Sequence, residues 1–318
     1  MTVPIAELPQ AGLSPARTPG RVPQSRALLR VARIGAWPRC PPRQWLRHSS
    51  RPRPGQPPPG RRSRRAGIAG HALFNASTFF AGAAVALQIC YPLVHDSTRD
   101  RVTAAVVVTF AIAATAHAAG SIGVARGLAV VTISVGIGFV AEVAGVHSGI
   151  PFGSYQYADT LGPRLAGVPI VVGLAWAMMA WPAAVVARRL ARTRISQVVI
   201  GAWALASWDL FLDPQMVAAG HWSWRDPAPH LPGVPTVPLT NLLGWLLVST
   251  VVLLAGQCVV GSRSVRPDGP MLALYLWTYA SSVLALVAFL GLSAAALWGA
   301  LGMGLVALPL AVTLVRHR

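Results

Sequence analysis

The chain has 318 residues, of which 54% are hydrophobic and only 11% are charged, and its formal net charge is +18. A soluble domain carries about 25% charged residues, so this composition excludes an ordinary water-soluble globular domain. Fourteen of the 27 basic residues, all arginines, precede position 66. About half of the basic residues therefore belong to the N-terminal segment. Because the positive charge is concentrated there, it does not predict a nucleic-acid partner.

Residues 1–66 are rich in Pro, Arg and Gly and show no apolar periodicity. Such a segment cannot bury a hydrophobic core, so we expect a disordered basic tail. It has no apolar h-region of the kind a signal peptide needs. A basic arm on anionic lipid or nucleic acid and an upstream stretch translated from a wrongly assigned start are alternatives to a solvated tail.

Residues 67–318 contain long apolar runs, each near the roughly 20 residues that cross a bilayer as a helix. They predict an all-α, polytopic transmembrane helix bundle in the cell (plasma) membrane. The expected spans are 72–94, 102–120, 127–146, 167–187, 195–213, 239–261, 271–290 and 293–315.

The arginines of the connecting loops predict the orientation of the bundle. With the N-terminus inside, the inner loops and the C-terminus hold nine of them and the outer loops four. The inner set is Arg126, Arg188, Arg189, Arg192, Arg194, Arg263, Arg266, Arg316 and Arg318, and the outer set is Arg99, Arg101, Arg164 and Arg225. The positive-inside rule then predicts that both termini are cytoplasmic.

Three of the nine acidic residues fall inside predicted spans: Glu142, Asp209 and Asp213. A carboxylate costs several kcal/mol at membrane depth, so each is a candidate functional residue. Asp209 and Asp213 are four residues apart and share one helix face. Glu142 and Asp209 lie about 6 Å below the outer boundary, and Asp213, before Pro214, lies at the expected helix end. A structural hydrogen bond for Glu142 and a water-facing boundary position for Asp213 are the alternatives.

Other polar and aromatic residues gather at the same outer end, mostly in the loops 147–166 and 214–238. The candidate substrate-binding residues are Trp208, Tyr155, Tyr157, Phe152, His147, His221, Trp222, Trp224 and Asn241. The tyrosines and tryptophans also fit an interfacial aromatic belt, and the histidines also fit plain loop positions. The loop 147–166 mixes turn residues with apolar ones and suits a capping or re-entrant loop over the site.

Several blocks of the sequence resemble the integral-membrane carotenoid biosynthesis proteins, the bacterioruberin-type carotenoid hydratase family. They are Gly149-Ile150-Pro151-Phe152-Gly153-Ser154-Tyr155-Gln156-Tyr157, Trp208-Asp209-Leu210-Phe211-Leu212-Asp213-Pro214, His221-Trp222-Ser223-Trp224 and Asn241-Leu242-Leu243-Gly244-Trp245. The resemblance covers about 70–315. One departure is the longer loop between Gly233 and Asn241.

The resemblance implies addition of water to a terminal isoprenoid C=C of an acyclic C40 or C50 carotenoid, by a lyase that uses no cofactor. Other carotenoid-pathway membrane enzymes are possible partners, and the sequence has no CxxC, HExxH, Walker or GxSxG motif that would predict a metal or nucleotide site. From the residues alone, buried Asp209 is the expected acid. Asp213 or Glu142, kept ionised, would stabilise the cation and accept a proton from water. Trp208 or Tyr155 would face the cation.

Three other functions use similar residues. Membrane prenyltransferases hold Mg²⁺ and a diphosphate with Asp-x-x-x-Asp, but this chain has one such pair and no lysine. A carotenoid cyclase also begins by protonating an alkene. A carotenoid-binding or transport protein would use intramembrane carboxylates without chemistry.

Overall fold

The computed structural model describes residues 61–261, 263, 265 and 267–316. The predicted tail therefore lies outside the described residues except for its last six, which form the first turns of a helix. The helices are α1 (Arg61–Cys90), α2 (Asp96–Ile122), α3 (Val124–Ser148), α4 (Ile170–Leu190), α5 (Arg194–Ala206), α6 (Asp209–Ala218), α7 (Leu239–Val260), α8 (Gly269–Ala288) and α9 (Ser293–Arg316), with a 3-10 turn η1 (Tyr91–Leu93) after α1.

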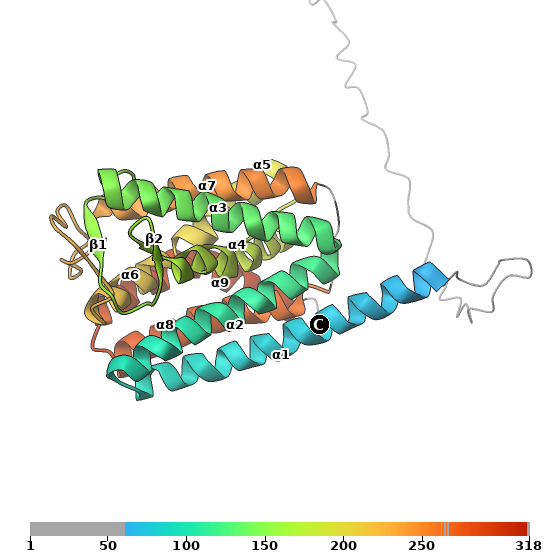
Figure 1. The fold of residues 1–318 in the computed structure, drawn as a ribbon, viewed down its shortest axis with the longest axis horizontal. Coiled ribbons are helices and arrows are strands. Elements are labelled where there is room, and N and C mark those ends of the chain that lie inside the picture. The colour runs from blue at the N-terminus through green and yellow to red at the C-terminus, as the bar shows by residue number, and fades with distance from the viewer. Residues whose placement is uncertain (1–60, 262, 264, 266, 317–318) are drawn as a thin grey trace, which may run out of the picture. The chain divides into compact units, whose positions relative to one another are not determined.

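Eight segments of this part of the chain are long and apolar enough to cross a membrane. Each overlaps one predicted span, which confirms the all-α, multi-pass architecture. The helices run back and forth as a bundle (Figure 1). The connections predicted to be outer lie at one end, here called the loop end, together with the short strands.

The fifth span differs from its prediction, because it consists of two helices. A turn at Ser207–Trp208 separates α5 from α6, and α6 continues through Pro214 to Ala218. The expectation that Pro214 ends the helix is wrong. A proline removes one backbone hydrogen bond, and α6 carries on past it because Pro214 is the sixth residue of a helix of only ten. Asp213 is consequently a buried helix residue and not a boundary residue.

Burial separates central from peripheral helices. In α4, 72% of the most apolar stretch is buried, against 17% in α1. Helix α4 packs against α2, α3, α5 and α8. On α9, Leu297, Leu301 and Leu305 are exposed at four-residue intervals and therefore share one face, as expected for a helix that contacts lipid.

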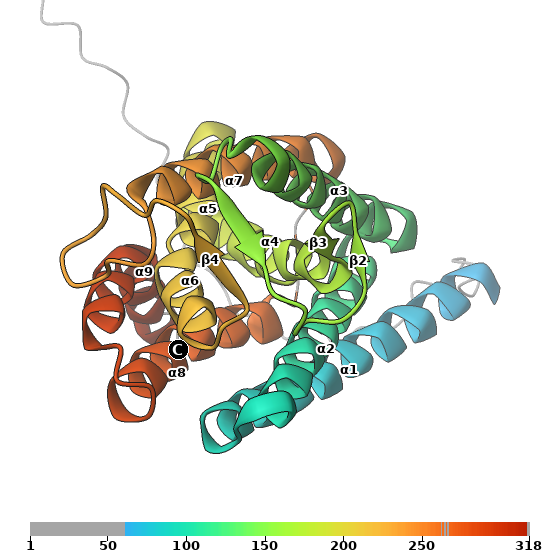
Figure 2. The same ribbon diagram turned by 60° about the vertical axis from the view of Figure 1, so that its left-hand side comes forward.

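Two small antiparallel sheets cover the loop end, where the sequence predicted only loops. Strand β1 (Tyr155–Tyr157) pairs with β4 (Trp222–Trp224), and β2 (Arg164–Leu165) pairs with β3 (Val168–Pro169). Figure 2 shows β1 and β4 side by side at this end of the bundle. The pairing joins the two longest loops through residues that are 65 to 69 positions apart in the sequence, and it brings Tyr155 and Tyr157 to the acidic Glu142 of α3.

Candidate active site

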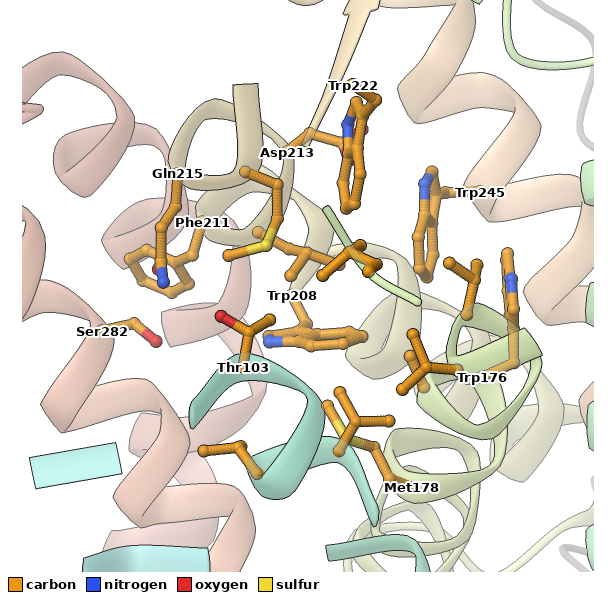
Figure 3. A pocket seen from close by; sticks show the side chains of 18 of the residues that line it. Thr103, Trp176, Met178, Trp208, Phe211, Asp213, Gln215, Trp222, Trp245 and Ser282 are labelled. Carbon is orange, nitrogen blue, oxygen red and sulfur yellow. The ribbon is translucent and has the colours of Figure 1, made fainter. Parts of the chain in front are cut away.

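A cavity of about 150 Å³ lies inside the loop end of the bundle. Its walls are mainly aromatic, and Figure 3 shows Trp208 between Phe211 on one side and Trp176 with Trp245 on the other. The rings of Trp176 and Trp245 stack with centroids 4.0 Å apart and an interplanar angle of 17°. The surface of the cavity is thus mostly apolar, and the few polar groups in its wall are the candidates for a chemical role.

Glu142, from α3, is one of these polar groups and is only 5% exposed. Its Oε2 accepts hydrogen bonds from the hydroxyls of Tyr155 at 2.5 Å and Tyr157 at 2.8 Å. Its Oε1 accepts one from the indole N–H of Trp176 at 3.0 Å. Three donors converge on this side chain, and each hydrogen bond favours the carboxylate form, whereas burial favours the neutral acid.

The β1–β4 pairing positions the aromatic groups around Glu142. Residues two apart in a strand point to the same side, and Tyr155 is paired with Trp224 while Tyr157 is paired with Trp222. All four therefore line the cavity, while Gln156 and Ser223 between them are exposed. Burial and then the charge of Glu142 raise the pKa of both Tyr155 and Tyr157. Both phenols remain protonated donors at physiological pH.

Asp209 and Asp213 meet at one amide. The Nδ2 of Asn241, from α7, donates to Oδ2 of Asp209 at 2.7 Å and also to Oδ2 of Asp213. The three residues are between 1% and 3% exposed. Only Asp213 and Asn241 line the aromatic cavity, where Figure 3 shows Asp213 next to Trp222. Asp209 lies behind them, and its Oδ1 has no hydrogen-bond partner among the described residues.

Most of the predicted site residues lie around this one cavity. Nine of the twelve candidates line the cavity: Glu142, Asp213, Phe152, Tyr155, Tyr157, Trp208, Trp222, Trp224 and Asn241. Of the other three, Asp209 contacts the site through Asn241. His147 is exposed at the end of α3, and His221 is fully buried outside the cavity wall, with Nδ1 2.7 Å from the hydroxyl of Thr160.

Two tryptophans, Trp176 and Trp245, and a group of polar side chains line the cavity but were not predicted from the sequence. Trp245 follows Asn241 by four residues, so the sequence alone indicated that the two side chains share one helix face. Trp176 had no such signal, because its bond to Glu142 depends on how α3 and α4 pack. The missed polar residues that line the cavity include Gln88, Thr103, Gln215, Thr278 and Ser282.

These polar residues come from four different helices, α1, α2, α6 and α8. Figure 3 shows Thr103, Gln215 and Ser282 together, on the opposite side from Trp176 and Trp245. Within the described part of the chain, Gln88 Oε1 and Thr278 Oγ1 are buried and have no hydrogen-bond partner. Buried polar atoms of this kind are the usual partners of ordered water.

Among the residues that the structure describes, no group of three or more His, Cys, Asp or Glu side chains is arranged to hold a metal ion. The two free cysteines of that part, Cys90 and Cys258, are exposed and do not contribute to the cavity.

Residues 102–310 match the family model described as "Carotenoid biosynthesis protein". The chain is also similar to the bisanhydrobacterioruberin hydratase of the archaeon Haloarcula japonica, with 30% identity over 141 residues. That alignment covers 40% of this chain and 43% of the relative's length. No solved structure matches the chain.

Proposed function

Because this chain belongs to the carotenoid biosynthesis protein family, we propose that it hydrates a terminal isoprenoid double bond of an acyclic carotenoid. The observation that carries the proposal is a pair of buried carboxyl groups, Asp213 and Glu142, in the wall of one aromatic cavity. The name of the Haloarcula relative indicates the same reaction for that protein.

The first step is protonation of the alkene, and Asp213 is the proposed donor. Asp209 and Asp213 each place Oδ2 within hydrogen-bond distance of one nitrogen, so their oxygens lie close together. Two neighbouring buried carboxylates repel each other, and such a pair holds one proton between them. Asp213 faces the cavity and Asp209 does not, so the proton leaves from Asp213. This revises the expectation that Asp209 itself is the acid.

The second step is stabilisation of the tertiary cation that protonation creates. Glu142, held as a carboxylate by its three donors, supplies a negative charge at the cavity wall. The faces of Trp208 and Trp245 supply cation–π attraction, which reaches about 2 kcal/mol in a desolvated site. The apolar walls exclude other nucleophiles.

The third step is capture of the cation by water. Oγ1 of Thr278 and Oε1 of Gln88, which have no partner among the described residues, offer hydrogen bonds to water in the cavity. Oxygen of the water bonds to the tertiary carbon, and the released proton returns to Asp213. The net change is alkene plus water to tertiary alcohol, with the acid regenerated and no redox cofactor consumed.

The test is expression in a bacterial host that makes lycopene or an anhydro-carotenoid, followed by mass analysis of the pigments. The wild-type protein is expected to add the mass of one or two waters. Asp213→Asn is expected to lower the product by about 10²-fold or more, because the amide cannot donate the proton. Asp226→Asn is the matched control, since Asp226 is an exposed loop residue.

Two results would contradict the proposal. Wild-type yield from Asp213→Asn would remove this residue as the acid. A product of unchanged mass but altered absorption or retention would indicate cyclisation instead of hydration.

A further inference from the structure

A second hollow adjoins the active-site cavity on the side of α2 and α4. It has a volume of about 650 Å³ and is bounded by the loop-end halves of these two helices and by residues 159–163. We refer to it as the lateral groove. Helix α2 contributes Asp100, Ala104 and Val108 to it, and α4 contributes Ile170 and Leu174.

The lateral groove is polar toward the loop end and apolar along its length. Ser97, Asp100 and Thr160 lie at the polar end. Val108 and Ile170 are 40% and 51% exposed on the surface of the bundle, so the apolar part opens sideways between two membrane-spanning helices. A groove of this form accepts a long apolar molecule from the lipid phase.

Two side chains separate the groove from the active-site cavity. Among the described residues, only Leu161 and Val171 line both hollows. Leu161 is buried and Val171 is half-buried. The groove and the cavity are therefore neighbouring spaces that share a wall of two aliphatic side chains.

The end group of the substrate and the rest of its chain need different surroundings. The cavity, with its buried carboxyl groups and aromatic walls, suits one terminal isoprenoid unit next to Asp213. An acyclic C40 polyene extends far beyond that unit, so the rest of the chain needs an apolar path that leads away from the carboxyl groups.

We propose that the polyene of the acyclic carotenoid lies in the lateral groove, and that its end group reaches Asp213 by passing between Leu161 and Val171. This inference rests on the proposed function and names the route and the subsite for its substrate. Leu161 is thereby a specificity-determining residue, because its volume sets the width of the passage.

The loop that carries Leu161 is held in place on the side away from α4. The hydroxyl of Thr160 is 2.7 Å from Nδ1 of His221, and Nε2 of His221 is 3.9 Å from the carboxylate of Asp100 on α2. The backbone N–H of Ala158 also donates to the carbonyl of His221 at 2.8 Å, so this loop is linked to the His221 segment and the width of the passage depends on the side chains at 161 and 171.

The experiment compares two substrates in variants of the passage and the groove. The substrates are a full-length acyclic carotenoid and a short acyclic terpene with the same terminal double bond, which fits the cavity without the groove. Leu161→Trp obstructs the passage and Ala104→Trp fills the groove. Leu165→Trp is the control, because Leu165 is 61% exposed in the nearby strand β2 and lines neither hollow.

We expect the ratio of carotenoid to short-terpene hydration rates to fall about tenfold or more in both variants and to stay at the wild-type value in the control. An unchanged ratio in both variants overturns the inference. If Ala104→Trp leaves the ratio unchanged but releases a phospholipid that copurifies with the wild type, the groove is a lipid site and the inference is also overturned.

Pigment content gives a measurement that does not depend on turnover. The wild-type protein purified from a carotenoid-producing host is expected to retain pigment, and Ala104→Trp is expected to retain several-fold less. Pigment bound by a wild-type protein that hydrates neither substrate would contradict the proposed function alone. Equal pigment in both proteins would contradict the groove.

Discussion

Glu142 and Asp213 face the same cavity but have different surroundings, and the roles proposed for them follow from this difference. Glu142 is bonded by two phenols and an indole, all donors. Asp213 shares one amide with a second carboxyl group, that of Asp209. Donors around a carboxyl group favour its carboxylate form against the effect of burial, whereas a buried carboxyl pair favours retention of a proton. This contrast is why we propose Asp213 as the acid and Glu142 as the negative charge.

His221 supplies a prediction at the same scale. Burial lowers the pKa of His221, and the neighbouring charge of Arg99 acts in the same direction, while Asp100 opposes them. An unfolded or opened loop binds the proton more readily, at about pH 6.5. The free energy that holds the Thr160 loop is therefore fully present above this pH and is lost as the pH falls below it.

We expect the midpoint of thermal unfolding to be lower at about pH 5.5 than at about pH 7.5, and this decrease to be smaller in His221→Gln. Thermal unfolding of the detergent-purified proteins measures both values. His230→Gln is the control, because His230 is exposed. An equal pH dependence in all three proteins would show that His221 does not titrate with unfolding.

At the scale of elements, α6 owes its position to the glycines of α9. A Cβ atom at Gly299 would overlap the ring of Phe211, and one at Gly302 would overlap the side chain of Leu210. Helix α9 therefore allows a close approach of α6, and Phe211 is seated where it lines the cavity. The backbone of α9 is in this way part of the support for Asp209 and Asp213.

Gly299→Ala tests this support. We expect a loss of about 1–3 kcal/mol of stability from overpacking, together with a lower yield of the proposed hydration product, because Phe211 must move into the cavity or α6 must shift. Thermal unfolding and product yield measure the two effects. Gly136→Ala in α3 is the matched control, since a Cβ there meets nothing within 4 Å. Equal stability of the two variants would mean that the α6–α9 contact adapts without cost.

At the scale of the whole molecule, the orientation in the membrane stays a prediction from the arginine distribution. The connections with more arginines lie at the end of the bundle opposite to the cavity, so the positive-inside rule places the site at the outer leaflet. Water would then reach the acids over a short distance, and the carotenoid would enter from the lipid between α2 and α4.

Reporter fusions in a bacterial inner membrane test the orientation. A fluorescent protein fused after residue 318 is expected to be fluorescent, because it folds in the cytoplasm. A phosphatase fused within the loop 225–232 is expected to be active, because it requires the periplasm. The opposite pattern would place the active site on the cytoplasmic side.

Some features of the acidic site can be predicted from the residue pattern along the chain, and others cannot. Counting residues along a helix predicted that Glu142 and Asp209 lie four residues before their helix ends, but α3 ends at Ser148 and α6 at Ala218, so both are farther from those ends than predicted. Alternation in Tyr155-Gln156-Tyr157 and Trp222-Ser223-Trp224 also predicts strands, although the two segments were interpreted as loops. Their pairing could not be predicted, because it joins segments far apart in the sequence.

The sequence by itself determined the membrane-spanning architecture, the family and the set of acidic and aromatic residues at one end of the bundle. These depend on hydropathy and residue identity, which are local properties of the chain. Only the tertiary structure decided that Asp213 faces the cavity while Asp209 lies behind it, that Trp176 bonds Glu142, and that a groove adjoins the site. These depend on how each helix is rotated against its neighbours, and close packing between helices, not the spacing along one of them, sets that rotation.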